Sequence, residues 1–148
     1  MALFVSKKNI GNLCQQAVSN QIDINEQDES GWTILHHAAS QNNDSICDSL
    51  IKAGADVNIQ NVHGNTALGI AALNGNNDAA TALIYGGADT SIKNNDLKTA
   101  DEIADSYARV REQETPTGEL IRKLPLKVKL EDGLKVNQTA NRSKVFKQ

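Results

Sequence analysis

The sequence predicts an all-α fold: a solenoid of antiparallel helix pairs, stacked side by side and joined by short hairpin fingers. Its main support is a shift of 33 residues that lays matching residue types over one another along most of the chain, because a fixed period of this length indicates a repeat architecture. Aromatic residues make up only 3% of the chain. The interior must therefore be built from many small contacts among Ala, Leu and Ile, which favours a helical array over a sandwich or barrel.

The first half of the repeat is expected to be a turn followed by a helix. It reads Gly-x-Thr-x-Leu-x-x-Ala-Ala at residues 31–39 and again at 64–72. The hydroxyls of Thr33 and Thr66 can accept a hydrogen bond from a free amide of the first helical turn. The small alanine pairs allow the helices of adjacent repeats to approach closely.

The second half is expected to be another helix that ends at a glycine. It reads Leu-Ile-x-x-Gly-Ala-Asp at residues 50–56 and 83–89. The Leu-Ile pair, with further apolar residues one turn earlier, forms the buried face of that helix. Gly54 and Gly87 then allow the left-handed backbone that commonly follows a helix.

The boundaries of the repeat domain follow from these matches. Residues 1–114 comprise an N-terminal cap without a finger, two full repeats and a degenerate repeat, at residues 1–27, 28–60, 61–93 and 94–114. The terminal units of a stack are atypical because one of their faces meets water. Asn20 and Asn42 stand at or beside positions where the repeat has glycine, and asparagine tolerates the left-handed conformation next best.

The two patterns at this spacing resemble the ankyrin repeat. The resemblance covers residues 1–110 and implies helix pairs with fingers at right angles, which together make an L-shaped concave surface for binding other proteins. Besides these glycine positions, the chain departs from the family pattern at four further places. The proline usually found after the threonine is Ile34 and Ala67, and in the last unit the finger glycine and the core leucine are Leu97 and Asp101.

In ankyrin arrays, partners usually meet the finger tips and the exposed side of the first helices. The resemblance therefore implies these protein-binding residues: Glu29, Ser30, Trp32, Ser40, Gln41, Val62, His63, Asn65, Leu73, Asn74, Asn95, Asp96 and Lys98. Trp32 is the chain's single tryptophan, a residue type enriched among those that dominate binding energy. The alternative is that its ring only covers the neighbouring finger near His63.

Asn58 is a candidate for modification. It resembles the target residue of asparaginyl hydroxylases that act on ankyrin proteins, with Leu50 eight residues before it. Hydroxylation requires that the organism or its host has such an enzyme. The alternative is that Asn58 only stabilises a turn.

Residues 115–148 do not continue the repeat and form a basic C-terminal tail. Its opening Thr-Pro-Thr-Gly is typical of a chain break. A short helix at residues 119–124 would close the last repeat with its apolar side chains. After Pro125, apolar and basic residues alternate around Asp132-Gly133, which predicts a β-hairpin at residues 126–136.

The charge is unevenly spread along the chain. Residues 1–110 carry 6 basic and 13 acidic side chains, a net charge of −7, and residues 111–148 carry 9 basic and 5 acidic ones, a net charge of +4. An acidic body argues against sequence-independent binding of nucleic acid, which needs clustered Lys and Arg. The basic tail suits a solvated strand face or docking on the acidic repeats; an anionic partner or membrane surface is the alternative.

The residues that could carry chemistry are explained by the repeat. Cys14 and Cys47 hold the same inward position of the second helix, which suits a small buried apolar residue. His36 stands at the usual histidine position of the family, where it hydrogen-bonds neighbouring backbone. Metal-ligand spacing and Gly-rich phosphate motifs are absent from the sequence. We therefore expect no enzyme activity, no catalytic residue, no metal and no cofactor.

The sequence thus predicts a protein-protein interaction module, a small ankyrin adaptor or inhibitor that is monomeric alone and binds a partner protein through its concave face. We expect no membrane span and no secretory signal, and hence a cytoplasmic protein. One alternative is a bacterial effector that binds a host protein in the host cytosol. The other is an assembly chaperone or complex subunit that uses the C-terminal hairpin to add strands to another protein's sheet.

Overall fold

The computed structural model describes residues 9–111 and 116–145, with side chains at 9–107 and 117–131. Residues 1–8 of the expected cap and the expected domain boundary after residue 114 lie outside this part of the chain. The described residues form seven helices and no strand. The helices are α1 (Ile10–Val18), α2 (Ile34–Ser40), α3 (Asp44–Lys52), α4 (Ala67–Asn74), α5 (Asn77–Tyr85), α6 (Ala100–Arg111) and α7 (Pro116–Val145).

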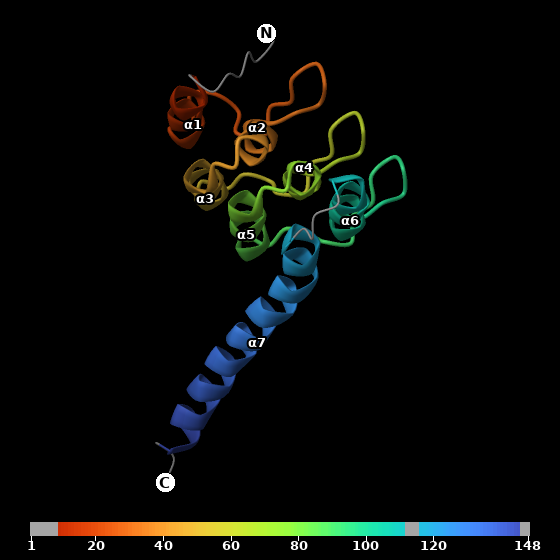
Figure 1. The fold of residues 1–148 in the computed structure, drawn as a ribbon. Helices are drawn as coiled ribbons and strands as arrows, with labels where there is room; N and C mark the ends of the chain where they lie inside the picture. Colours follow the sequence, from red (N-terminus) through yellow and green to blue (C-terminus); the bar gives the residue numbers. More distant parts are fainter. Residues whose placement is uncertain (1–8, 112–115, 146–148) are drawn as a thin grey trace.

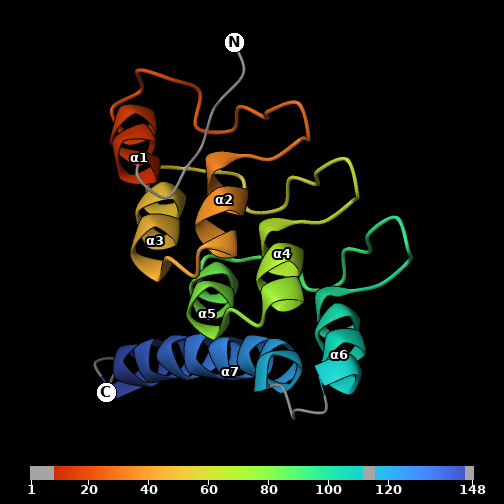
Figure 2. The same ribbon diagram turned by 45° about the horizontal axis from the view of Figure 1, so that its top comes forward.

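The helices form two layers (Figure 1, Figure 2). In the inner layer α2, α4 and α6 stack in that order, and in the outer layer α1, α3, α5 and α7 do the same. Three finger loops project on one side of the molecule and lead into α2, α4 and α6 (Figure 1). This arrangement confirms the predicted all-α solenoid of helix pairs.

The inner helices begin at the predicted threonines. The Thr33 hydroxyl accepts a hydrogen bond from the His36 N–H at 3.3 Å, and the Thr66 hydroxyl accepts one from the Gly69 N–H at 3.2 Å. Each bond satisfies an amide that has no partner within its helix. The 33-residue offset therefore predicts the helix starts correctly.

The turns after the helices also follow the sequence. Gly54 and Gly87 adopt φ values of 98° and 91°, in the left-handed region. Asn20 and Asn42, the two asparagines expected to replace glycine, have φ values of 58° and 52°. Both replacements are confirmed.

The core runs through the stack as a band of small and branched side chains. The alanine pairs at residues 38–39 and 71–72 are buried, and so are Leu50 and Leu83 of the outer helices. Burying one leucine contributes about 1.5–3 kcal/mol relative to leaving it in water. Small residues at the inner positions let the layers come close enough for these leucines to lose their contact with water.

The structure of the C-terminal segment differs from the predicted hairpin. The β-hairpin expected at residues 126–136 is wrong, because Pro116–Val145 is one helix, α7. Ile121 and Leu124 are buried, and Val128 packs against the same core. Residues three and four apart share one helix face, so packing on α5 and α6 outweighs the local turn signal that follows.

Helix α7 serves as the outer helix of the last repeat, and it includes Pro116, Thr117 and Gly118 of the expected chain break, whereas residue 115 lies outside the described residues. Pro116 is its first residue, where the missing N–H costs nothing. Gly118 permits close contact with α6, because a Cβ there would lie 2.5 Å from Asp105 Oδ1. Arg122 Nε donates to Asp101 Oδ2 at 3.2 Å, and its guanidinium also pairs with Asp105. Helix α7 thus covers the end of the stack.

We expect Ile121→Ala to lower the free energy of unfolding by about 2–4 kcal/mol, because deleting a fully buried side chain leaves a cavity. The side chain is 1% exposed. Urea unfolding followed by circular dichroism measures the change. The control is Val18→Ala at an exposed position of α1, which should change stability by less than about 0.5 kcal/mol. Equal effects of the two substitutions would contradict the packing of α7 on the stack.

Candidate functional site

The three fingers share one internal support. In each finger a side-chain oxygen accepts hydrogen bonds at 2.9–3.0 Å from the backbone N–H groups two and four residues further on; the three residues are Asp28, Asn61 and Asn94. Aspartate and asparagine favour such turns because their short side chains reach their own backbone. The tip of every finger is therefore closed on itself.

Backbone hydrogen bonds also join each finger to the next. The Val62 N–H donates to the Ser30 carbonyl at 3.1 Å, and the Asn95 N–H donates to the His63 carbonyl at 3.0 Å. The Asn95 side-chain amide adds a bond to the Val62 carbonyl at 2.9 Å. These four predicted binding residues thus lie together on one connected surface.

Two glutamines that sequence reasoning missed, Gln27 and Gln60, form hydrogen bonds that join neighbouring fingers. The Gln27 amide donates to the Gly31 carbonyl of its own finger at 2.9 Å and to the Gln60 carbonyl of the next at 3.2 Å. Gln60 repeats this with the Gly64 and Lys93 carbonyls at 2.8 and 3.1 Å. Their recurrence at the 33-residue offset was the signal that could have found them.

The Trp32 ring lies at the base of the first finger, half-buried. Its aromatic contacts are within its own repeat, at centroid distances of 4.8 Å to His37 and 6.0 Å to His36. His37 Nε2 in turn lies 3.0 Å from Asp28 Oδ2. The indole is therefore held in place while part of its surface stays open to solvent.

Asp28 is occupied by these internal contacts. Partial burial raises the pKa of its carboxyl, but hydrogen bonds from the Trp32 N–H, the His37 side chain and the Ser30 N–H outweigh that effect, and the pKa of Asp28 lies below its ordinary value. The carboxylate therefore stays ionised at neutral pH and anchors the finger.

His36 links the first inner helix to the second finger. Its Nδ1 accepts from the Thr33 N–H at 3.1 Å, which leaves the proton on Nε2, and Nε2 donates to the Asn65 carbonyl at 2.9 Å. This confirms the predicted bond to neighbouring backbone. Burial lowers the pKa of His36 more than the Asn65 carbonyl raises it, so the ring is neutral in the folded protein.

The structure divides the predicted binding residues into two groups. Nine lie on the fingers, and Ser40, Gln41, Leu73 and Asn74 lie at the C-terminal ends of α2 and α4. A helix of seven or eight residues is about 10–12 Å long, so the second group is set back from the finger tips. Of these four residues only Asn74 is exposed, while the others are half-buried.

Leu97 belongs to the finger surface, although sequence reasoning did not include it in the site. Its side chain is 74% exposed and its φ is 59°, in the left-handed region that Gly31 and Gly64 occupy in the preceding fingers. That conformation costs a residue with a Cβ about 1–2 kcal/mol, and such strain concentrates at functional sites. The sequence signal that could have identified Leu97 is its place at the position that Gly31 and Gly64 hold in the preceding fingers.

Asn58 lies in the loop between α3 and the second finger rather than at a finger tip. Its side-chain oxygen accepts from the Asp89 N–H at 2.9 Å, and its own N–H donates to Asp56 Oδ1 at 2.9 Å. It therefore has the turn-stabilising role that was the alternative to modification. Hydroxylation at this residue stays a prediction.

The two cysteines lie in the core, as predicted. Burial raises the pKa of the Cys14 thiol, and burial together with the charge of Asp44 raises the pKa of Cys47 to about 12. A thiol with such a pKa holds almost no thiolate at neutral pH, so Cys47 is a poor nucleophile.

Among the described helices, none is both long and apolar enough to cross a bilayer.

Comparison with known proteins agrees with this geometry. A family model described as ankyrin repeats in three copies matches residues 2–94, which is well over half of the chain. A search of curated proteins finds no match.

The fit between fingers predicts unequal effects of two glycine substitutions. A Cβ at Gly64 would lie 2.7 Å from the Asn95 backbone N, whereas a Cβ at Gly54 would have nothing within 4 Å. Both residues have positive φ, so each alanine carries a conformational cost of about 1–2 kcal/mol. Gly64→Ala should cost about 1–3 kcal/mol more, from overpacking, in urea unfolding. Equal losses would contradict the close contact of the fingers.

Because His36 is buried, we expect the stability of the protein to depend on pH. Because its pKa is lower in the folded than in the unfolded chain, the unfolded chain binds more protons, and stability should fall as the pH drops below about 6.5. The slope contributed by one such group is at most about 1.4 kcal/mol per pH unit. Urea unfolding at several pH values should show a smaller slope in His36→Gln, while His63→Gln, at an exposed finger position, should retain it. An unchanged slope in His36→Gln would refute the assignment.

Proposed function

Because the chain belongs to the ankyrin-repeat family, we propose that it is an adaptor or inhibitor that binds one partner protein through its concave face. Ankyrin repeats generally mediate protein-protein interactions, and proteins built from them are typically binding modules without enzymatic activity. The proposed surface comprises the three fingers and the exposed parts of α2, α4 and α6.

The connection between the fingers supports this proposal most directly. Their backbones are hydrogen-bonded to one another through Val62 and Asn95, and each tip is closed by its own aspartate or asparagine. A partner therefore meets a surface that is ordered before binding, and little conformational entropy is lost on association.

The finger surface also carries side chains suited to anchoring a partner. Trp32 on the first finger is half-buried, Val62 on the second is 56% exposed, and Leu97 on the third is 74% exposed. Polar residues such as Glu29 and Asp96 lie exposed beside them. Apolar anchors within a polar rim are the usual composition of a protein interface.

The alternative of an assembly chaperone or complex subunit that adds strands to another protein's sheet is not supported. That alternative depended on the hairpin at residues 126–136, whereas α7 is a helix and presents no free strand edge.

The proposal predicts that Trp32→Ala weakens partner binding at least tenfold, equivalent to about 1.4 kcal/mol, because an ordered aromatic anchor is lost. Tyr85→Ala is the matched control, since this aromatic residue is 51% exposed on the outer helix α5. Quantitative affinity capture should find proteins that bind the wild type and Tyr85→Ala but not Trp32→Ala. Binding partners can then be titrated by calorimetry. Equal capture by both variants would place the binding surface elsewhere.

A further inference from the structure

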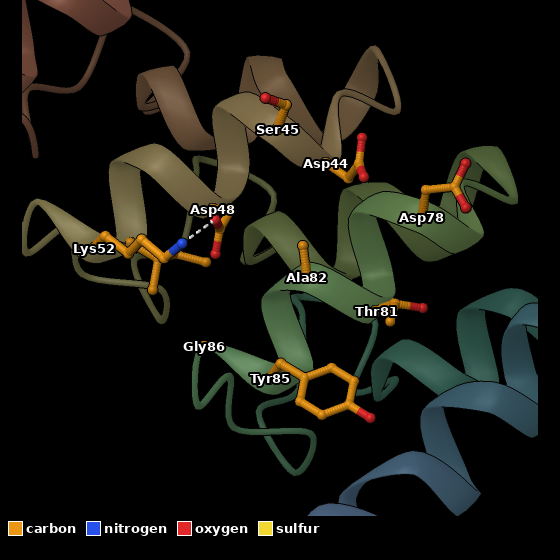
Figure 3. A pocket seen from close by; sticks show the side chains of 10 residues that line it. Asp44, Ser45, Asp48, Lys52, Asp78, Thr81, Ala82, Tyr85 and Gly86 are labelled. Carbon is orange, nitrogen blue, oxygen red and sulfur yellow. Dashed lines mark ion pairs between the residues drawn. The ribbon is translucent and has the colours of Figure 1, made fainter.

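A groove of about 720 Å³ crosses the outer layer between α3 and α5 (Figure 3). Its apolar lining includes Ile51 from α3 and Ala82 from α5. Asp44, Asp48 and Asp78 also line it. The groove thus combines apolar surface with carboxylates, and it lies on the helix layer farthest from the fingers (Figure 1).

The charges in this groove are not fully balanced within it. Asp48 pairs with Lys52 at 2.6 Å, and Asp78 accepts from the Asn42 amide at 3.2 Å. Asp44 and Asp78 stand in the first turns of their helices, where carboxylates are favourable. Three carboxylates against one ammonium group nevertheless leave a net charge of −2 along the lining. An occupant of this groove should therefore be basic and partly apolar.

The same chain presents a surface of that kind on α7. Leu126 and Leu130 are 63% and 68% exposed, and residues four apart lie on one side of a helix. Lys127 and Lys129 are exposed beside them. Helix α7 extends well past the stacked helices (Figure 1), which makes this segment accessible to another molecule.

We propose that α7 of one chain lies in the α3–α5 groove of a second copy. Leu126 and Leu130 would cover the apolar lining, and the two lysines would lie among the carboxylates. The chain's own α7 is not the occupant, because Ile121 and Leu124 already hold it against the end of its own stack. If each chain inserts its helix into the other, the contact is isologous and closes as a two-fold dimer. This differs from the monomer expected from the sequence.

The proposal is independent of the finger surface. The groove and the exposed face of α7 share no residue with the proposed partner-binding site. Dimerisation through α7 therefore leaves the fingers free, and the two functions can be tested separately.

Sedimentation equilibrium of the full chain over a concentration series tests the proposal. We expect a monomer–dimer equilibrium that weakens as salt is added, because charge pairs contribute to it. Asp48→Lys and Lys127→Glu should each weaken dimerisation about tenfold. Leu126→Ser should also weaken the dimer.

The controls separate this contact from general effects of charge. Glu29→Lys reverses a charge on an exposed finger residue and should leave dimerisation unchanged. All the substituted residues are exposed, and circular dichroism should show that each variant keeps its helices. A wild-type chain that stays monomeric at every concentration would overturn the proposal. Single charge reversals that leave the dimer as stable as the wild type would also overturn it.

Discussion

The close approach of successive fingers and helices is the constraint on which this molecule depends. A Cβ at Gly31 would lie 3.0 Å from Asn61 Cα and from Val62 N, so glycine is needed where one finger rests on the next. That approach permits the hydrogen bond from the Val62 N–H to the Ser30 carbonyl. Each repeat contacts only its neighbours, and the stability of the stack therefore depends on the stability of each repeat and on the contacts between neighbours.

At the last described finger, the close approach that requires glycine in the preceding fingers is missing. Leu97 replaces the finger glycine in the last described finger, where no further finger follows among the described residues, and its side chain points into free space. In the outer layer α7 completes the last repeat by packing on α5 and α6, with Gly118 close to Asp105. A short array needs such a cover, because an uncovered terminal face exposes apolar surface to water.

The interactions that stabilise the fold also shape the proposed binding surface. The glutamines under the fingers, the aspartate and asparagine turns and the His36 bridge to the Asn65 carbonyl all serve stability, and they also hold the finger tips in one arrangement. A partner therefore meets exposed side chains on a fixed backbone. The outer layer has a different character, since its groove is acidic and the helix beside it is basic.

The helix starts, the turns and the burial of the cysteines could be predicted from the sequence alone, because each depends on contacts within a repeat or between identical neighbours. Most of the candidate finger residues followed from the resemblance to the ankyrin repeat, and their role in binding stays a prediction. The sequence could not decide the conformation after Pro125, where a local turn signal and a helical spacing of Ile121, Leu124 and Val128 compete. Only the tertiary structure settled that competition, because burial against α5 and α6 is a long-range contact that no local pattern contains.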